Sequence, residues 1–478
     1  MAELIAQLKS IVGEKYCLSG NDDRQKYDND ATGEYQSRSL AVVRPANTAE
    51  VAAVVKLANE TKTPIVPQSG NTGLAGGGFA GTGENQFILS TDRMNEILEI
   101  NPKSRVAKVQ AGVVLANIHA AVDPYDLVFP LLFGARGSCM IGGNLSTNAG
   151  GSNVVRYGNT RALCLGLEVV TANGDVVNLM SELHKDNTGY DLKDLFIGAE
   201  GTLGIITAAV LKLFPKPKAY TTAMVAVPKI SDALDLLAKV QAASGGGVEA
   251  FEYMPANYFY HLKRVDPTAP MPFAKFEKVG ILVEVAATAD RDAIPDETGA
   301  IPVQTMLEET LSAMIESGQV LDATIAQNEN QRQEFWRQRE KTFEVCNSQG
   351  VPITTDVSVP LDKVGEFLKR ANARLLEIAP KSELIEIAHL GDGNLHYSMW
   401  VDPETREPAS KEMQTAIYTM VEDVVQELNG SFSAEHGIGL SKLGSMERRK
   451  DKAALGVMRA IKMALDPNNI FNPGKVLP

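Results

Sequence analysis

Three of the six histidines in the chain lie between positions 389 and 436, and a glutamate lies beside one of them. His389 and His396 flank a Gly-Asp-Gly sequence, and Glu435 directly precedes His436. Two histidines and a carboxylate, with coordination positions left open, are a common ligand set for a catalytic divalent metal. A group of structural histidines with a helix-capping glutamate is the alternative interpretation.

Three segments of the first half are rich in glycine, asparagine and threonine. They span residues 67–78, 134–151 and 197–207. Glycine lets backbone N–H groups approach a phosphate closely, and three such segments suit a large polar ligand that contains a pyrophosphate. Taken alone, the first segment is equally consistent with a flexible surface loop. Gly76, Gly78 and Gly81 match G-x-G-x-x-G, but strand 87–90 follows where a nicotinamide-binding fold requires a helix, which argues against a nicotinamide dehydrogenase.

Two arginines, Arg337 and Arg339, lie on a predicted polar helix over residues 326–348. A bidentate arginine is the expected partner for the carboxylate of a small acid. Residues two positions apart face different sides of a helix, so only one of the pair is expected to bind such a group.

The elements that position these residues alternate between strands and helices. Strands are predicted at 40–44, 65–67, 87–90, 105–110, 221–227, 279–285, 386–388 and 395–399. Helices are predicted at 48–59, with Thr48 as N-cap, and at 230–242, 304–318, 326–348 and 452–464. Pro215 and Pro217 indicate a domain boundary near residue 217. Beyond it the pattern predicts a smaller antiparallel sheet covered by helices. The interleaved strands and helices of the chain indicate an α+β or α/β architecture.

Length and charge narrow the class of protein. A chain of 478 residues with 44% hydrophobic and 22% charged residues predicts two or more globular domains. A net charge of −13 argues against a nucleic-acid partner. Four scattered cysteines without a C-x-x-C pair, no secretory signal and no 18-residue apolar run predict a cytoplasmic location.

With these motifs in order, the sequence resembles the vanillyl-alcohol oxidase and p-cresol methylhydroxylase (PCMH) flavoprotein superfamily, from about residue 20 to the C-terminus. Within it, the chain is similar to the branch of D-2-hydroxyglutarate, D-lactate and glycolate dehydrogenases. The resemblance implies a two-subdomain PCMH-type FAD-binding domain over 1–217 and a ferredoxin-like, antiparallel-sheet substrate (cap) domain over 218–430. A C-terminal helical segment, 431–478, is expected to return to the flavin.

The same resemblance assigns residues to the cofactors. FAD is expected to bind without a covalent link, since the first glycine segment contains no histidine. The expected FAD contacts are Pro67, Gly70, Asn71, Thr72, Gly73, Ser138, Gly142, Gly143, Thr147, Asn148, Gly150, Glu200, Gly201, Ile206 and Asn472. The expected ligands of a divalent metal (zinc, with manganese or cobalt as alternatives) are His389, His396 and Glu435.

The implied reaction is oxidation of a small anionic D-2-hydroxy acid to the 2-oxo acid. Hydride passes from C2 to flavin N5, while the metal and His436 activate the hydroxyl and Arg339 binds the carboxylate. The best match in substrate is D-2-hydroxyglutarate, but Thr354 and Ser398 stand where that subgroup is expected to have lysine and asparagine. Losing a cation there favours a smaller or less charged acid such as D-lactate or glycolate.

Several alternatives stay open at this stage. A zinc hydrolase would use the histidines but leave the glycine segments unexplained, and an anion-binding module would give His436 no role. The electron acceptor is expected to be an electron-transfer flavoprotein, a quinone or a cytochrome, and a homodimer is the expected assembly.

Overall fold

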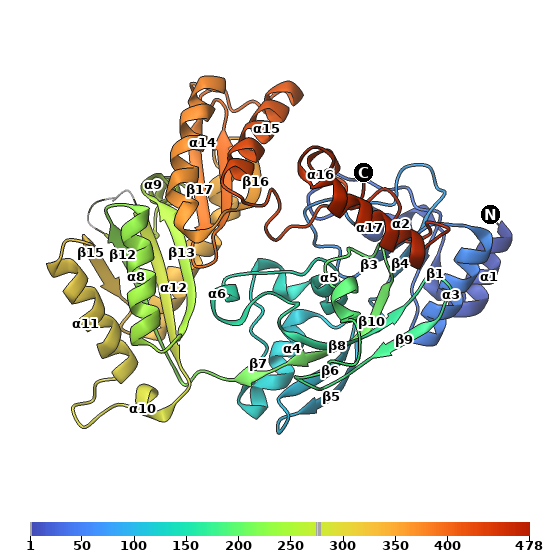
Figure 1. The fold of residues 1–478 in the computed structure, drawn as a ribbon, viewed down its shortest axis with the longest axis horizontal. Coiled ribbons are helices and arrows are strands. Elements are labelled where there is room, and N and C mark those ends of the chain that lie inside the picture. Colours follow the sequence, from blue (N-terminus) through green and yellow to red (C-terminus); the bar gives the residue numbers. More distant parts are fainter. Residues whose placement is uncertain (1, 274, 276–278) are drawn as a thin grey trace. The chain divides into compact units, whose positions relative to one another are not determined.

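The computed structural model describes residues 2–273, 275 and 279–478, and the chain divides into two compact units (Figure 1). The first unit comprises Met1–Gly150, Gly158–Pro215 and Glu435–Pro478, and the second comprises Gly151–Tyr157 and Lys216–Ala434. The sequence placed a boundary at 217 and a separate segment at 431–478. In the structure, the chain passes between units after Gly150, Tyr157, Pro215 and Ala434, and residues 435–478 belong to the first unit.

One sheet of the first unit has four strands in the order β1-β2-β4-β3. The strands are β1 (Cys17–Leu18), β2 (Val42–Val43), β3 (Ile65–Gln68) and β4 (Phe87–Ser90). β4 runs parallel to both β2 and β3. Helix α3 (Thr48–Thr61) packs its valines against this sheet in a shared apolar core. The predicted Thr48 N-cap was wrong, because the side chain of Asn47 accepts the N–H of Glu50 at 3.0 Å and so caps the helix one residue earlier.

The second sheet of this unit is antiparallel, with five strands in the order β5-β6-β10-β8-β9. These strands are β5 (Ile97–Asn101), β6 (Val106–Gln110), β8 (Cys164–Val170), β9 (Val176–Leu179) and β10 (Ile205–Lys212). A short pair joins β7 (Leu127–Val128) to β11 (Phe214–Pro215). The other helices of the unit are α1 (Ala2–Val12), α2 (Asn21–Asp28), α4 (Leu115–Val122), α5 (Ile141–Ser146), α7 (Lys193–Phe196), α16 (Leu443–Arg449) and α17 (Lys452–Leu465).

The C-terminal residues complete the first unit. Phe471 bridges to Ile65 at the start of β3, and the N–H of Asn472 donates to the carbonyl of Ile65 at 2.8 Å. Lys462 on α17 donates to the carbonyls of Thr202 and Phe471, both at 2.8 Å. These bonds hold the last residues of the chain against the start of β3, the strand that leads into the first glycine segment.

The second unit is built on one antiparallel sheet of seven strands, in the order β15-β12-β14-β13-β17-β18-β16. Its strands are β12 (Ala219–Val227), β13 (Val248–Pro255), β14 (Val279–Ala287), β15 (Asp322–Ile325), β16 (Ile353–Ser358), β17 (Glu383–His389) and β18 (Asn394–Trp400). The expectation of a smaller sheet was therefore wrong. Strands β13, β15 and β16, which the sequence did not predict, extend it beyond either sheet of the first unit.

Helices cover both faces of this sheet (Figure 1). One face packs on α8 (Ile230–Ala243), α11 (Pro302–Glu316), α14 (Val364–Ile378) and α15 (Lys411–Glu427). The other face packs on α9 (Ala256–Val265), α12 (Glu329–Glu340) and α13 (Thr342–Cys346). The helix predicted over 326–348 is thus two helices that meet at Lys341. The short helices α6 (Val154–Tyr157) and α10 (Asp290–Ala293) complete the unit.

Among the described residues, no helix has the length and apolar character needed to cross a membrane.

Candidate functional site

The two histidines of the first motif lie on the β17–β18 hairpin. His389 ends β17 and pairs with Asn394, while His396 on β18 pairs with Ile387. Because side chains alternate across a strand, the two imidazoles share one face of the sheet, and their ring centroids are 5.4 Å apart. The predicted pairing of residues 386–388 with 395–399 is confirmed.

A carboxylate that the sequence did not single out lies opposite His396. Asp356 on β16 is its direct cross-strand partner and is buried, with 2% of its surface exposed. Its Oδ1 accepts the amide of Asn394 at 3.0 Å, and its Oδ2 accepts the backbone N–H of Ala434 at 3.2 Å. Ala434 immediately precedes Glu435, so Asp356 fixes the chain at the point where the second motif begins.

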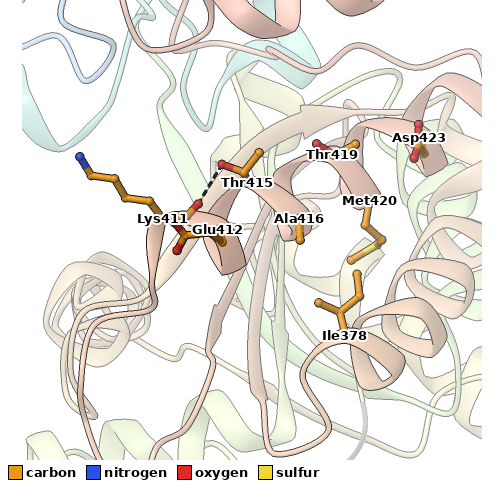
Figure 2. Close-up of a pocket in the computed structure, with 8 residues that line it drawn as sticks. All are labelled: Ile378, Lys411, Glu412, Thr415, Ala416, Thr419, Met420 and Asp423. Carbon is orange, nitrogen blue, oxygen red and sulfur yellow. Dashed lines mark hydrogen bonds between the residues drawn. The ribbon is translucent and has the colours of Figure 1, made fainter.

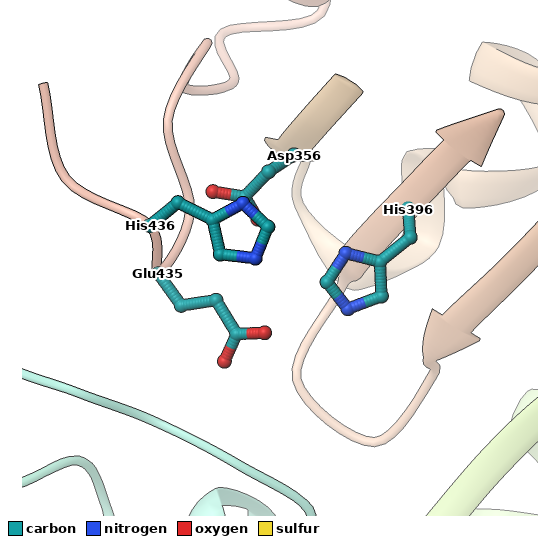
Figure 3. Close-up of side chains that lie close together, drawn as sticks. All are labelled: Asp356, His396, Glu435 and His436. Atoms are coloured by element: carbon teal, nitrogen blue, oxygen red, sulfur yellow. The ribbon is translucent and has the colours of Figure 1, made fainter. Parts of the chain in front are cut away.

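Four side chains from these segments come together (Figure 3). Asp356, His396, Glu435 and His436 each offer a ligand atom, and these atoms all lie within 4.8 Å of one another. Imidazole nitrogens and carboxylate oxygens suit zinc and manganese, so the donor set fits a divalent metal. Of the predicted ligands, His396 and Glu435 are in this set, and His389 lies beside it.

A second buried carboxylate links His389 to the predicted substrate arginine. Glu252 on β13 has 1% of its surface exposed, and its Oε1 accepts Nδ1–H of His389 at 2.8 Å. Its Oε2 accepts Nε of Arg339 at 2.9 Å and lies 2.8 Å from Nη2. Burial raises the pKa of Glu252, but His389 and Arg339 outweigh it and hold the pKa below its ordinary value. The signal for Glu252 in the sequence is weak, because it is one of two glutamates, with Glu249, in a strand whose other residues are apolar or aromatic.

The two arginines of α12 have different surroundings. Arg339 is buried, and its Nη1 donates to the hydroxyl of Thr342 at 2.9 Å. The side chain of Arg337 is 40% exposed and pairs with Glu334 and Asp266 at the surface. Of these two arginines, Arg339 shares the carboxylate of Glu252 with His389, whereas Arg337 pairs with Glu334 and Asp266. Which arginine binds a substrate stays a prediction.

Two hydroxyls lie next along the same face of the sheet. Thr354 and Ser398 are cross-strand partners, two residues before Asp356 and two residues after His396. The hydroxyl of Ser398 donates to that of Thr354 at 3.1 Å. This pair of side chains therefore carries no charge.

The three glycine segments meet within the first unit. The N–H groups of Gly198 and Glu200 donate to the carbonyls of Leu145 and Ser146 at 3.0 and 2.8 Å, which joins the third segment to the second. A Cβ on Gly143 would lie 2.4 Å from the carbonyl oxygen of Ser69, so only glycine permits the contact between the second and first segments.

The predicted FAD residues lie on these segments and their flanking elements. Pro67 is in β3, residues 70–73 form the loop after it, Gly142 and Gly143 open α5, and Ile206 lies in β10. Asn472 ties the C-terminus to this group, since its Nδ2 donates to the carbonyls of Gly77 and Glu200 at 3.0 and 2.9 Å.

Two buried side-chain oxygens in this region suit a polar ligand such as FAD. Within the described part of the chain, the Oδ1 atoms of Asn144 and Asn472 are buried without a hydrogen-bond partner. Both can accept hydrogen bonds from hydroxyl or N–H groups of a bound cofactor. The residues present therefore fit FAD.

The side chain of Glu200 also has a role within the protein. Its two carboxylate oxygens accept the backbone N–H groups of Ile438 and Gly439, each at 2.7 Å. Burial raises the pKa of Glu200, against the opposing effect of these two N–H groups and of Lys442. Glu200 thus anchors the loop that follows His436.

An open groove of about 690 Å³ lies elsewhere in the second unit, between the end of α14 and α15 (Figure 2). Its lining comes from Ile378 and from seven residues of α15, and it includes none of the predicted site residues. This groove is therefore not the candidate site.

Comparison with known proteins identifies two matching families. Residues 39–180 match the FAD binding domain, and residues 216–476 match the FAD linked oxidases, C-terminal domain. The D-2-hydroxyglutarate dehydrogenase of Stutzerimonas stutzeri (strain A1501) is 36% identical over 99% of this chain and 98% of its own length. The mitochondrial D-2-hydroxyglutarate dehydrogenase of Bos taurus is 38% identical over 92% of this chain and 77% of its own length.

Solved structures of low sequence identity share the fold. Alkyldihydroxyacetonephosphate synthase aligns with a TM-score of 0.73 at 15% identity, over 99% of this chain and 84% of that one. p-Cresol methylhydroxylase with substrate bound aligns with a TM-score of 0.71 at 17% identity, over 99% of this chain and 96% of that one. They confirm the predicted α+β fold class with its PCMH-type architecture. The two family models and the relatives at 36% and 38% identity show that this chain is an oxidoreductase of the FAD-linked oxidase family to which the D-2-hydroxyglutarate dehydrogenases belong.

Proposed function

We propose that the protein is an FAD-dependent dehydrogenase that oxidises a D-2-hydroxy acid to the corresponding 2-oxo acid. The observation that carries the proposal is the group of Asp356, His396, Glu435 and His436, with Arg339 held nearby through Glu252 and His389. Relatives named D-2-hydroxyglutarate dehydrogenase make D-2-hydroxyglutarate the first substrate to test.

The residues divide the work of the reaction between them. When bound, FAD supplies the acceptor for the hydride that leaves C2, and a divalent metal supplies a Lewis acid for the hydroxyl. His389, His396 and Glu435 would hold the metal, with Asp356 within reach. Arg339 would bind the C1 carboxylate and orient C2, and a neutral His436 would accept the hydroxyl proton.

The metal set can be tested residue by residue. His389→Ala, His396→Ala and Glu435→Ala are each expected to lower bound metal and turnover but leave the flavin spectrum intact. His436→Ala is expected to keep its metal while kcat falls by ~10²–10⁴, the usual contribution of a general base. Asp356→Asn tests whether the third ligand beside His396 and Glu435 is His389 or Asp356. If Asp356→Asn loses the metal and His389→Ala retains it, Asp356 is the ligand and His389 is not.

Wild-type activity provides the wider test of a metal role. Treatment with a chelator is expected to abolish turnover, and added zinc, manganese or cobalt to restore part of it. A metal-free preparation with full activity would exclude the metal and leave His436 to act alone.

The hydroxyl pair of Thr354 and Ser398 favours the alternative substrate class, a monocarboxylate such as D-lactate or glycolate. A second carboxylate on the substrate would find only neutral hydroxyl groups at Thr354 and Ser398. A panel of D-2-hydroxy acids with a dye acceptor decides the question. A higher kcat/KM for D-lactate or glycolate than for D-2-hydroxyglutarate supports the neutral lining as the determinant, and the reverse order excludes it.

We further propose an electron-transfer flavoprotein or a quinone as the electron acceptor, and a homodimer as the assembly. A cytoplasmic location is the expectation from the four cysteines, which are all free and buried. Some relatives carry the word mitochondrial in their names, so fractionation of the native source is the relevant measurement.

A further inference from the structure

Glu252 is a fully buried carboxylate at the middle of the seven-stranded sheet. It pairs with Leu282 on β14 on one side and with His389 on β17 on the other. Its two oxygens are divided between two partners, Oε1 for His389 and Oε2 for Arg339. A buried charge of this kind is costly unless it is paired and hydrogen-bonded, and here both conditions are met.

Each bond restricts the atom that its partner presents to the site. An ionised carboxylate only accepts hydrogen bonds, so Nδ1 of His389 carries a hydrogen. In the neutral imidazole that can bind a metal, Nε2 then carries the lone pair. A carboxylate behind an imidazole fixes the tautomer and ring orientation of a metal-binding histidine. On the other side, Glu252 and Thr342 fix the plane of the guanidinium of Arg339 from two directions.

We propose that Glu252 is a positioning residue that sets the metal-binding nitrogen of His389 and the carboxylate-binding arginine through one side chain. The proposal rests on the function proposed above, because it takes His389 as a metal ligand and Arg339 as the substrate clamp. It predicts that metal affinity and KM change together when Glu252 is altered.

A neighbouring carboxylate provides a matched control. Glu284 on β14 is also buried, at 3% exposure, and also faces helix α12. It accepts two hydrogen bonds from Arg332, both at 2.7 Å, and others from Trp336 and Thr222. Glu284 holds the same helix to the same sheet, and its hydrogen bonds among the described residues go to Arg332, Trp336 and Thr222, so it serves as the structural control.

Glu252→Gln is the decisive variant, because it keeps the shape and removes the charge. Its amide has one oxygen and one NH₂ group, and that NH₂ would face a donor of either His389 or Arg339. Metal affinity, measured by competition with a chromogenic chelator, is expected to fall by ~10–100-fold, the usual effect of losing such a partner. KM is expected to rise in the same variant. Glu284→Gln is expected to lower Tm but to leave metal affinity and KM at wild-type values.

The metal measurement separates this proposal from the proposed function. If the wild type oxidises no 2-hydroxy acid, the proposed function fails, whereas the metal affinity of Glu252→Gln still reports on His389. Wild-type metal affinity and KM in Glu252→Gln would overturn the positioning role. If that variant does not fold, Glu252→Asp, whose shorter side chain reaches only one partner, must show the loss in metal affinity or in KM. A Glu252→Asp protein with the metal affinity and the KM of the wild type would overturn the proposal.

A double variant sharpens the result. If Glu252 acts on the metal through His389, adding Glu252→Gln to His389→Ala should lower metal affinity no further. An additional loss of the same size in the double variant would show that the effect of Glu252 bypasses His389, and it would contradict the proposed linkage.

Discussion

The anchoring of the loop after His436 by Glu200 gives a sharp prediction. Resemblance to known flavoproteins placed Glu200 at the cofactor, whereas in the structure its carboxylate accepts the N–H groups of Ile438 and Gly439. Gly437 is part of the same arrangement, since it has φ of +79° and a Cβ there would lie 2.8 Å from Oε1 of Glu200. We therefore expect Glu200→Gln to loosen the loop that carries the proposed base, and not to release the flavin.

The size of the effect follows from the two hydrogen bonds. A glutamine can accept one of the two N–H groups, but its own NH₂ then faces the other. One charge-assisted bond is lost and the second is weakened, and a bond to a charged group contributes about 1.5–3 kcal/mol. At about 1.4 kcal/mol per factor of ten, kcat is expected to fall by ~10–100-fold if turnover requires the anchored loop.

The assay combines turnover, flavin content and pH. Flavin content should stay at the wild-type level, because the bond from Asn472 goes to the main-chain carbonyl of Glu200, which the variant keeps. Since the wild-type carboxylate becomes neutral as pH falls through its raised pKa, the advantage of the wild type over Glu200→Gln should shrink in acid. Glu168→Gln is the control: its carboxylate accepts hydroxyls of Thr48 and Thr207, away from the loop, and kcat should not change.

A specific result would refute this reasoning. If Glu200→Gln loses FAD while kcat per bound flavin stays at the wild-type value, the carboxylate meets the cofactor and the loop does not depend on it.

Three further predictions concern the cofactor, the arginines and a buried lysine. The purified protein should be yellow and should release its flavin on acid precipitation; flavin that remains with the precipitated chain would indicate a covalent link. Arg339→Ala should raise KM by ~10–150-fold, from the loss of about 1.5–3 kcal/mol, whereas the exposed Arg337→Ala should have little effect; the reverse ranking would identify the other arginine as the clamp. Burial lowers the pKa of Lys475 to about 8, so between about pH 8 and 10 the unfolded chain keeps a proton that the native state has lost, and the free energy of unfolding should rise. Urea denaturation of Lys475→Met over this range should lack that rise, and an identical rise in the variant would assign it to another group.

The part of the site that could be predicted from sequence is local. His389 and His396 flank a short turn between two segments of strand character. The two segments pair as a hairpin, so the histidines come together, and they are less than ten positions apart in the sequence. The glycine segments were recognisable from composition for the same reason. In each case the chemistry and the backbone geometry that it needs are encoded in one short stretch.

The residues that sequence missed depend on the order of strands in the sheet. Glu252 meets His389 because β13 lies beside β17, and Asp356 meets His396 because β16 lies beside β18. Neither neighbour follows from periodicity, since more than 100 residues separate β13 from β17. The error in the N-cap of α3 has another cause. Asn47 and Thr48 are both favourable cap residues, and the structure shows that Asn47 accepts the N–H of Glu50.

Helix geometry explains why only one arginine of α12 reaches the site. Arg332, Trp336 and Arg339 stand at positions i, i+4 and i+7, so they face the sheet together, and Arg337 does not. Each inward arginine meets a buried glutamate on a neighbouring strand. Arg339 differs from Arg332 because its glutamate, Glu252, also holds a histidine.

The charges around Arg339 lead to a last prediction, on the coupling of metal and substrate. Glu252 already neutralises Arg339, so a substrate carboxylate that binds there needs further positive charge nearby. A divalent metal at His396 and Glu435 would supply it, and metal and substrate should then strengthen each other's binding by the same factor. We expect the 2-oxo acid product to bind at least ~10-fold more weakly to chelator-treated protein, a coupling at the scale of about 1–3 kcal/mol. Calorimetric titration of the product, with and without metal, measures the factor without turnover. Equal affinity in both states would show that Arg339 binds the carboxylate without help from the metal, and the charge argument would then be wrong.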